Sequence, residues 1–286
     1  MNPPRMLVTG GSGYLGGWVA RSARGDWEVT ATFSAKPSGE PGIAWRRLDV
    51  RDRADVESLI AQVEPQVVVH TAALNPGQGD DLHGVNVVGT GNVARAAAAV
   101  GARLIHTSTD IVFDGTKGNY SETDGLAPVT DYGRSKAGAE DAVTTAGVEA
   151  VIIRSSLIYG WRPTVARAAR WMIDTANRGE PLQLWSDELR CPIWAESLAA
   201  ALVELAGLDY TGFLHLGGSQ VVSRYEFGIK LLRFAGADTG RVEAAPTPAD
   251  WVRPLDCTMD TSLARSILQT PLPGLDEVLA RGDAIR

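Results

Sequence analysis

A tyrosine and a lysine one helical turn apart are the residues of this chain best suited to proton transfer. They are Tyr132 and Lys136, and a helix over residues 132–136 would place both side chains on one face. A free tyrosine, with a pKa of about 10, is a poor acid or base at neutral pH, and a neighbouring ammonium group stabilises its anion. The pair therefore indicates acid–base chemistry at a hydroxyl or carbonyl group.

The Tyr-x-x-x-Lys pattern alone does not identify a catalytic site, because it is common on exposed helix faces. The residues around it have to be considered as well. A glycine-rich segment lies upstream at residues 9–16, and two hydroxyl side chains, Ser108 and Thr109, end the apolar run before the pair. A Ser or Thr at the end of a strand usually serves the turn that follows. In combination, phenol, ammonium, hydroxyl and glycine loop predict a catalytic triad beside a nucleotide.

The glycine-rich segment has the features of a pyrophosphate-binding loop. It follows a strand-like run and opens a helix-like one. Its glycines permit a tight turn, close approach of an anion to the backbone, and close packing of helix on strand. The helix N-terminus adds unpaired N–H groups and the positive end of its dipole. The predicted cofactor contacts in this loop are Gly10, Ser12, Gly13, Tyr14, Leu15 and Gly16.

The end of the second predicted strand, residues 28–33, favours NADP(H). An acidic residue at this point would bind the ribose 2′-hydroxyl and repel a 2′-phosphate, and none is present. Ser34 and Lys36 follow the strand and are candidate contacts of the 2′-phosphate. The alternative is that both are solvated loop residues, which leaves NAD(H) possible.

An alternation of strands and helices has to position these residues. Short runs rich in Val and Ile predict buried strands, and Ala-rich amphipathic runs between them predict helices. The predicted strands are 6–8, 28–33, 67–70, 104–108 and 148–154, and the predicted helices are 14–24, 53–63, 85–100 and 132–145. This alternation predicts an α/β fold with a doubly wound, Rossmann-like parallel sheet.

The second half of the chain is less regular. It contains predicted helices at 164–178, 195–205, 223–235 and 275–281, a strand at 213–216, a turn-rich segment at 181–192 and a Pro- and Ala-rich loop up to Pro254. We expect residues 1–160 to form a dinucleotide-binding domain. Residues 161–286 are expected to form mainly a smaller C-terminal substrate-binding lobe, with some segments returning to the main sheet.

Composition and charge narrow the class of protein. The 286 residues are 44% hydrophobic and 21% charged, which is ordinary for a globular enzyme. A net charge of −7 argues against a nucleic acid or an anionic membrane as the main partner. No apolar run reaches the roughly 18 residues of a membrane span. The sequence begins almost directly with a strand, so we expect a cytoplasmic protein.

Cysteine and histidine usage predicts no metal site. Cys191 and Cys257 share no metal-type spacing, and the four histidines are scattered along the chain. A disulfide between the two cysteines is not needed at this chain length.

The glycine loop and the Tyr-x-x-x-Lys pair together resemble the extended branch of the short-chain dehydrogenase/reductase family, over nearly the whole chain. The resemblance implies that Thr109 supplies the catalytic hydroxyl beside Tyr132 and Lys136, with Ser108 as the fallback. Asn86 matches a family asparagine near the active site. Equally, it is a helix residue whose side chain hydrogen-bonds to nearby backbone groups. The cofactor contacts implied beyond the first loop are Asp49, Val50, Ala72, Ala73, Asn86, Tyr132 and Lys136.

Four further segments resemble dTDP-4-dehydrorhamnose reductase and related sugar-nucleotide-binding proteins. They are residues 108–115, 154–160, 223–227 and 253–257. The resemblance implies an NAD(P)-dependent oxidoreductase that reduces a keto group on a (nucleotide-)sugar bound near Arg190 and Trp194. It also implies a homodimer formed through helices that flank the sheet, for which the Ala-rich run 93–100 is suited.

Departures from the reductase pattern leave alternatives open. Residues 74–81, Ile111 and Leu157 differ at substrate-facing positions, so the sugar itself is not specified. Related dehydratases carry an acidic residue where Ile111 stands, which argues against dehydration. A sugar-nucleotide epimerase would use the same tyrosine and lysine and is one alternative. A non-catalytic NADP-binding regulator, like the regulatory subunit of methionine adenosyltransferase, is another.

Overall fold

The computed structural model describes residues 3–282. The chain forms two compact units, each built from segments that lie far apart in the sequence. The first unit contains the residues up to Thr109 together with 131–154 and 199–214. The second contains 110–130, 155–198 and the residues from His215 onward.

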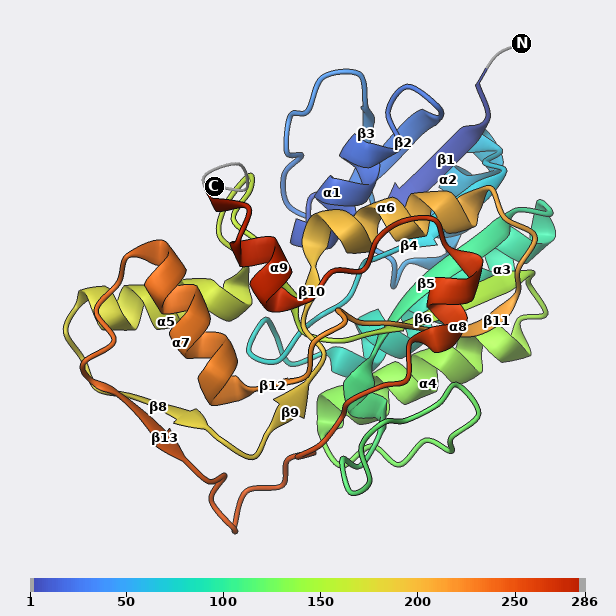
Figure 1. Ribbon diagram of the computed structural model, residues 1–286. Coiled ribbons are helices and arrows are strands. Elements are labelled where there is room, and N and C mark those ends of the chain that lie inside the picture. Colours follow the sequence, from blue (N-terminus) through green and yellow to red (C-terminus); the bar gives the residue numbers. More distant parts are fainter. Residues whose placement is uncertain (1–2, 283–286) are drawn as a thin grey trace. The chain divides into compact units, whose positions relative to one another are not determined.

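A seven-stranded sheet with the order β11-β6-β5-β4-β1-β2-β3 is the frame of the first unit (Figure 1). Its strands are β1 (Arg5–Thr9), β2 (Glu28–Phe33), β3 (Ala44–Arg47), β4 (Val67–His70), β5 (Arg103–Thr109), β6 (Ala150–Ser155) and β11 (Gly212–Leu216). β1 pairs in parallel with β2 and β4, and the pairs β2–β3 and β4–β5 are also parallel. The predicted doubly wound α/β fold is confirmed.

The strand order reverses between β1 and β4. Strands β1 to β3 extend the sheet in one direction and β4 to β6 in the other. Sheets of this kind bind ligands outside the carboxyl ends of the strands at such a switch point. Thr9 and His70 are register partners at the ends of β1 and β4. The segments that follow them, starting at Gly10 and Thr71, therefore lie at the switch point.

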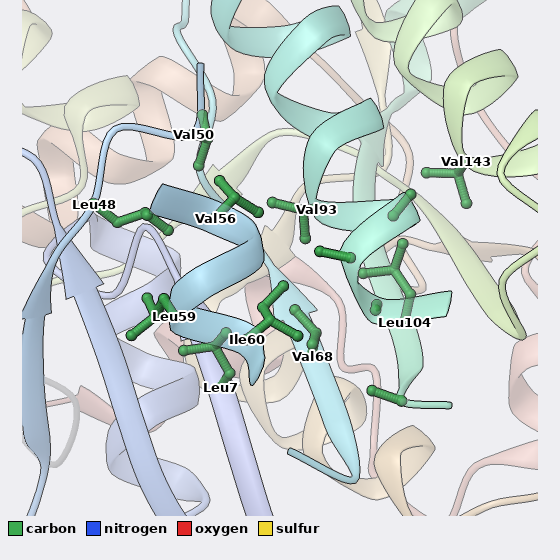
Figure 2. Close-up of a cluster of buried hydrophobic side chains, with 14 of the residues drawn as sticks. Leu7, Leu48, Val50, Val56, Leu59, Ile60, Val68, Val93, Leu104 and Val143 are labelled. Atoms are coloured by element: carbon green, nitrogen blue, oxygen red, sulfur yellow. The ribbon is translucent and has the colours of Figure 1, made fainter. Parts of the chain in front are cut away.

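Helices pack onto this sheet through apolar faces. They are α1 (Tyr14–Ser22), α2 (Arg53–Val63), α3 (Thr90–Ala99), α4 (Asp131–Thr145) and part of α6 (Ala195–Ala206). α1 packs on β1 and β2, and α3 lies between α2 and α4. Figure 2 shows Leu59 and Ile60 of α2 together with Leu7 of β1 and Val68 of β4, all buried. Burial of apolar surface, at roughly 25 cal/mol per Å², holds these layers together.

The segment predicted as one helix over 85–100 consists of two elements. A π-helix, η1 (His83–Gly89), precedes α3, which begins at Thr90. Asn86 lies in η1 and is buried. Its side-chain amide accepts a hydrogen bond from the Leu74 N–H (2.8 Å) and donates one to the Leu74 carbonyl (3.0 Å). π-Helical turns are frequent at functional sites, and this one ties the segment after β4 to η1.

The second unit has its own core. Its helices are η2 (Asp110–Val112), α5 (Arg167–Asn177), α7 (Arg224–Ala235), α8 (Ser262–Ile267) and α9 (Leu275–Leu279). Its short strands are β7 (Ile158–Tyr159), β8 (Leu182–Trp185), β9 (Leu189–Arg190), β10 (Ile193–Trp194), β12 (Val222–Ser223) and β13 (Val242–Ala245). Met172 of α5, Leu184 of β8 and Phe227 of α7 are buried in this core. α7 begins with a capping box between Ser223 and Glu226, which satisfies two backbone N–H groups.

Three parts of the secondary-structure prediction are wrong in this region and at the sheet edge. The segment 181–192, predicted as turn-rich, contains β8 and β9, and the loop up to Pro254 contains β13. β8 pairs in parallel with β13, a partner distant in sequence, so neither strand carries a strong local pattern. β3 was not predicted because this edge strand exposes most of its side chains.

Within residues 3–282, no helix combines the length and the hydrophobicity that crossing a bilayer would need.

Candidate active site

The glycine loop between β1 and α1 is packed tightly against the end of β4. Gly10 has a φ of 70°, which favours glycine, and a Cβ atom on it would lie 2.6 Å from the Ala72 nitrogen. A Cβ atom on Gly16 would clash with the Gly10 carbonyl and lie 2.6 Å from the Thr71 hydroxyl oxygen. The Ser12 N–H donates to the Thr32 carbonyl (3.2 Å), which fixes the loop to the end of β2.

The start of α1 offers a place for an anion. Gly13 is the N-cap residue and provides no side-chain cap, and the first turn contains no acidic residue. The first-turn N–H groups of a helix have no partner within the helix, and the helix dipole favours negative charge at this end. Ser12 and Gly13 are exposed beside it, and Tyr14 and Leu15 are half-buried. This bare helix start could hold an anion such as a pyrophosphate.

The loop after β2 carries a lysine, Lys36, close to the strand end, and its carboxylate, Glu40, is ion-paired with Arg21 (2.8 Å). Ser34 and Lys36 are exposed there, as the sequence predicts. Arg47 of β3 is the register partner of Phe33, and its Nε donates to the Ser34 carbonyl oxygen at 3.4 Å. Sequence reasoning missed Arg47, because β3 itself was missed. Arg47 is thus a second cation, besides Lys36, near the predicted position of the adenosine ribose of the cofactor.

Asp49 and Val50 lie after β3. Arg51 donates to the Asp49 carboxylate through Nε (3.0 Å) and Nη2 (2.7 Å), and to Asp81 through Nη1 (3.0 Å). The hydrogen bond from Arg51 lowers the pKa of Asp49, so this carboxylate is an ionised acceptor at neutral pH. Val50 is buried against Gly89, where a Cβ atom would lie 2.5 Å from the valine side chain.

Asn86 connects the end of β4 to α4. Besides its two bonds to Leu74, its Nδ2 donates to the Ser135 hydroxyl oxygen (2.9 Å), and that hydroxyl donates to the Tyr132 carbonyl (2.8 Å). Asn86 thus satisfies nearby backbone, one of the two interpretations open from the sequence. A direct contact between Asn86 and a cofactor stays a prediction, as do the contacts from the half-buried Ala72 and Ala73.

The three predicted catalytic side chains come from the end of β5 and the start of α4. Lys136 is 2% exposed, and its Nζ donates to the Thr107 carbonyl oxygen at 2.7 Å. The structure therefore brings Lys136 to the strand end that carries Thr109. Thr109 and Tyr132 are half-buried. Ser108 is buried and donates to the Glu140 carboxylate, which makes Thr109 the more accessible hydroxyl.

Lys136 is the positive charge in a cluster of buried bases. Burial lowers its pKa to about 8, while Glu140, one turn further along α4, acts in the opposite direction. The Nε2 atom of His106 lies 3.4 Å from Nζ, and the ring of His70 stacks on that of His106 with centroids 5.4 Å apart. Burial and then the Lys136 charge lower the pKa of both histidines, so both imidazoles are neutral at pH 7.

The second unit contains a cavity of about 320 Å³ whose walls are aromatic and basic. The residues that line it are Trp171, Gln183, Leu184, Trp185, Arg224, Trp251 and Arg253. The rings of Trp185 and Trp251 meet edge to face with centroids 5.4 Å apart. Arg253 is ion-paired with the buried Glu188. Burial lowers the pKa of Arg224 to about 10, so its guanidinium is still charged at neutral pH.

Arg190 and Trp194 do not line this cavity, and substrate binding near them stays a prediction. The Arg190 guanidinium is buried and donates to the carbonyl oxygens of Leu255 (2.8 Å) and Pro254 (2.9 Å). Trp194 is 9% exposed, and the Arg281 guanidinium lies over its ring. Both side chains are used to hold the second unit together.

Cys191 and Cys257 are buried free thiols. In the described part of the chain, no group of three or more His, Cys, Asp and Glu side chains is arranged to hold a metal ion.

Comparison with known proteins places this chain in a family. The family model described as the RmlD substrate binding domain matches residues 4–282. The chain belongs to this family. A probable low-salt glycan biosynthesis reductase of Haloferax volcanii is 30% identical, over 97% of this chain and 97% of the relative. A dTDP-4-dehydrorhamnose reductase of Mycobacterium tuberculosis is 33% identical, over 87% of this chain and 81% of the relative.

A solved structure shows the same fold along almost the whole chain. The crystal structure of a hypothetical dTDP-4-dehydrorhamnose reductase from Sulfolobus tokodaii superimposes with a TM-score of 0.83 at 30% identity. The match covers 96% of this chain and 98% of that chain. The predicted membership of the extended short-chain dehydrogenase/reductase type, close to dTDP-4-dehydrorhamnose reductase, is confirmed.

Proposed function

We propose that this protein reduces a keto group of a sugar nucleotide, using a nicotinamide dinucleotide as the hydride donor. One observation carries the proposal: Lys136 is buried against the end of β5, in the same unit as the bare glycine cradle. The reductase names of the relatives from Haloferax volcanii and Mycobacterium tuberculosis support it.

The chain's own residues would handle the proton and the charge. When bound, the dinucleotide supplies the hydride. Tyr132 donates its hydroxyl proton to the carbonyl oxygen of the substrate, and the Thr109 hydroxyl donates a hydrogen bond to the same oxygen. The Lys136 ammonium stabilises the tyrosinate that forms, and the phenol then recovers a proton from solvent.

NADP(H) is the proposed cofactor, with NAD(H) as the weaker alternative. A 2′-phosphate would meet Ser34, Lys36 and Arg47 with no carboxylate among them, and a guanidinium suits phosphate geometry. The crystal structure of a dTDP-4-dehydrorhamnose reductase from Bacillus anthracis contains NADP in complex with the protein. The remaining cofactor contacts predicted from the sequence stay proposals of the same kind.

The cavity in the second unit is the proposed site for the nucleotide part of the substrate. Trp185 and Trp251 offer flat faces on which a nucleobase can stack. Arg224 and Arg253 supply charge for a diphosphate. A cavity of about 320 Å³ is within the range for small-molecule sites. The substrate-binding role of residues 161–286 stays a proposal that rests on this cavity.

A panel of keto sugars linked to dTDP, UDP or GDP tests the proposal. We expect oxidation of NADPH that depends on the keto sugar nucleotide and yields the matching hydroxy sugar by mass spectrometry. No oxidation with any member, at protein concentrations that bind NADPH, would count against a reductase.

Two other functions receive less support. An epimerase would return its cofactor unchanged, so net consumption of NADPH excludes it. A non-catalytic regulator has one observation in its favour: methionine adenosyltransferase 2 subunit beta of Pongo abelii is 31% identical over 78% of this chain. A folded protein that binds NADPH, reduces no keto sugar and forms a stable complex with a methionine adenosyltransferase would favour the regulator.

We also propose a homodimer in the cytoplasm, with α4 at the interface. Val93 and Ala97 of the Ala-rich run are buried in the core of the same chain, and the apolar residues of the run are exposed only at its end, at Ala99 and Val100. A groove between η1, α3 and α4, lined in part by Val87, Gly138 and Ala142, is the better surface for it. Light scattering after gel filtration tests the dimer.

A further inference from the structure

A buried ion pair lies beside the candidate catalytic group and has no part in the chemistry proposed above. Glu140 of α4 and Arg154 of β6 are 1% and 2% exposed. The Arg154 Nη2 lies 2.9 Å from Oε2 of Glu140, and its Nε donates to the same carboxylate. The Ser108 hydroxyl donates to Oε1 of Glu140 at 2.5 Å. One carboxylate thus joins β5, α4 and β6.

The position of Glu140 in the sequence connects it to the candidate catalytic side chains. It lies one turn after Lys136 and two turns after Tyr132 on α4, and its partner Ser108 directly precedes Thr109 on β5. Any shift of α4 along β5 would break the bond from Ser108. A displacement of about 1 Å at a reacting group can slow catalysis about a hundredfold.

We propose that Glu140 is a positioning residue: its contacts with Arg154 and Ser108 hold α4 and the end of β5 in one register, which keeps Lys136 and Thr109 in their working arrangement. The inference rests on the proposed function. Stability alone is a weak reason for such a pair, because a buried ion pair can often be replaced by apolar side chains without loss. The Arg154 guanidinium also lies over the Phe213 ring, 4.4 Å from its centroid, which fixes it in place.

The pKa of Lys136 is a second measurable quantity that depends on Glu140. Lys136 is surrounded by His106 and His70 from β5 and β4 and by Glu140 from its own helix. The two imidazoles are neutral, so Glu140 is the negative charge that favours the ammonium form of Lys136. Its removal therefore lowers the pKa of Lys136 further, whereas the loss of an ion pair that only stabilised the fold away from the lysine would leave that pKa unchanged.

The test uses the double variant Glu140→Gln/Arg154→Met, which removes both buried charges together and leaves neither unpaired. In the full-length protein we expect a cooperative fold and an unchanged KM for NADPH. We expect kcat to fall by about tenfold or more, and the alkaline limb of the pH profile to move to lower pH. The matched control is Arg53→Met/Glu57→Gln, which applies the same changes to an exposed pair on α2. It should behave as wild type.

A second measurement does not depend on turnover. Lysine side chains labelled with ¹³C at Cε are titrated by NMR, and the Lys136 signal is identified by its absence in Lys136→Arg. The double variant should show Lys136 titrating at lower pH than wild type. An unchanged Lys136 titration would overturn the inference. If wild type reduces no keto sugar, the proposed function fails while this titration still decides the role of Glu140.

A third variant covers the case in which the double variant does not fold. Ser108→Ala removes one hydrogen bond to Glu140 and adds no bulk. We expect the fold to be kept, kcat to fall severalfold and the KM for NADPH to stay unchanged. A folded Ser108→Ala protein with wild-type kcat would contradict the positioning role.

Discussion

The Nζ atom of Lys136 lies 2.7 Å from the Thr107 carbonyl oxygen, so the lysine of α4 is held against the strand that ends at Thr109. This contact brings the helix that carries Tyr132 and Lys136 to the end of the strand that carries Thr109, far from them in sequence. It also buries the ammonium, which lowers the pKa of Lys136 to about 8. Both consequences can be measured.

The first prediction concerns pH. Lys136 is an ammonium below its pKa, and the charge is lost as the pH rises through it. We therefore expect kcat/KM, which reports on the free enzyme, to fall above pH of about 8. The Lys136→Met variant should lack this limb and lose about 10²–10⁴-fold in rate. A profile that stays flat to pH 10 in wild type would argue against an essential ammonium.

The second prediction concerns the cofactor. Lys36→Ala and Arg47→Ala should each raise the KM for NADPH and leave the KM for NADH nearly unchanged, because only NADPH carries the 2′-phosphate. Arg53→Ala, which removes an exposed cation on α2, is the control and should change neither constant. Equal effects on both cofactors would show that these side chains do not contact the 2′-phosphate.

The third prediction concerns the glycine cradle. In Gly16→Ala the new methyl group would collide with the Gly10 carbonyl and approach Thr71, so the loop must shift. We expect the variant to stay folded and to lose most of its NADPH affinity, measured by quenching of protein fluorescence. Gly125→Ala is the control, because nothing lies within 4 Å of its added Cβ atom. Wild-type affinity in Gly16→Ala would contradict binding at this loop.

The fourth prediction concerns the substrate. Trp251 is 50% exposed, so Trp251→Ala should fold normally. Loss of one stacking surface is worth about 1–3 kcal/mol per base, which corresponds to a KM for the sugar nucleotide raised severalfold to a hundredfold. The KM for NADPH should not change. Val221→Ala, an exposed apolar residue of the same unit outside the cavity, should leave both constants unaltered.

The parts of the fold that follow from local pattern were predicted well. β2, β4 and α2 have the predicted bounds, because short strands of Val, Thr and Phe and an amphipathic helix are visible in a short window. β8 and β13 were missed because they form only by pairing with each other. η1 was missed because its turn depends on the contact of Asn86 with Leu74, which no local pattern records.

The sequence motifs of the candidate site could be predicted, but the surroundings of their residues could not. The glycine loop, Tyr132 and Lys136 stand out in the sequence. The environment of Lys136 does not: its burial, the neutral His106 beside it and the Glu140–Arg154 pair appear only when β5, α4 and β6 come together. The same holds for Arg190, whose hydrogen bonds to the backbone carbonyls of Leu255 and Pro254 are not visible in the sequence.

The most direct test of the central claim follows the hydride and the proton together. NADPH carrying deuterium on the transferred position is mixed with a keto sugar nucleotide, and incorporation into the hydroxy sugar is measured for wild type and Tyr132→Phe. We predict one deuterium per product in wild type, and a rate reduced by about 10²–10⁴-fold in Tyr132→Phe with NADPH binding intact. Deuterium transfer at the wild-type rate in Tyr132→Phe would contradict the assigned role of this tyrosine.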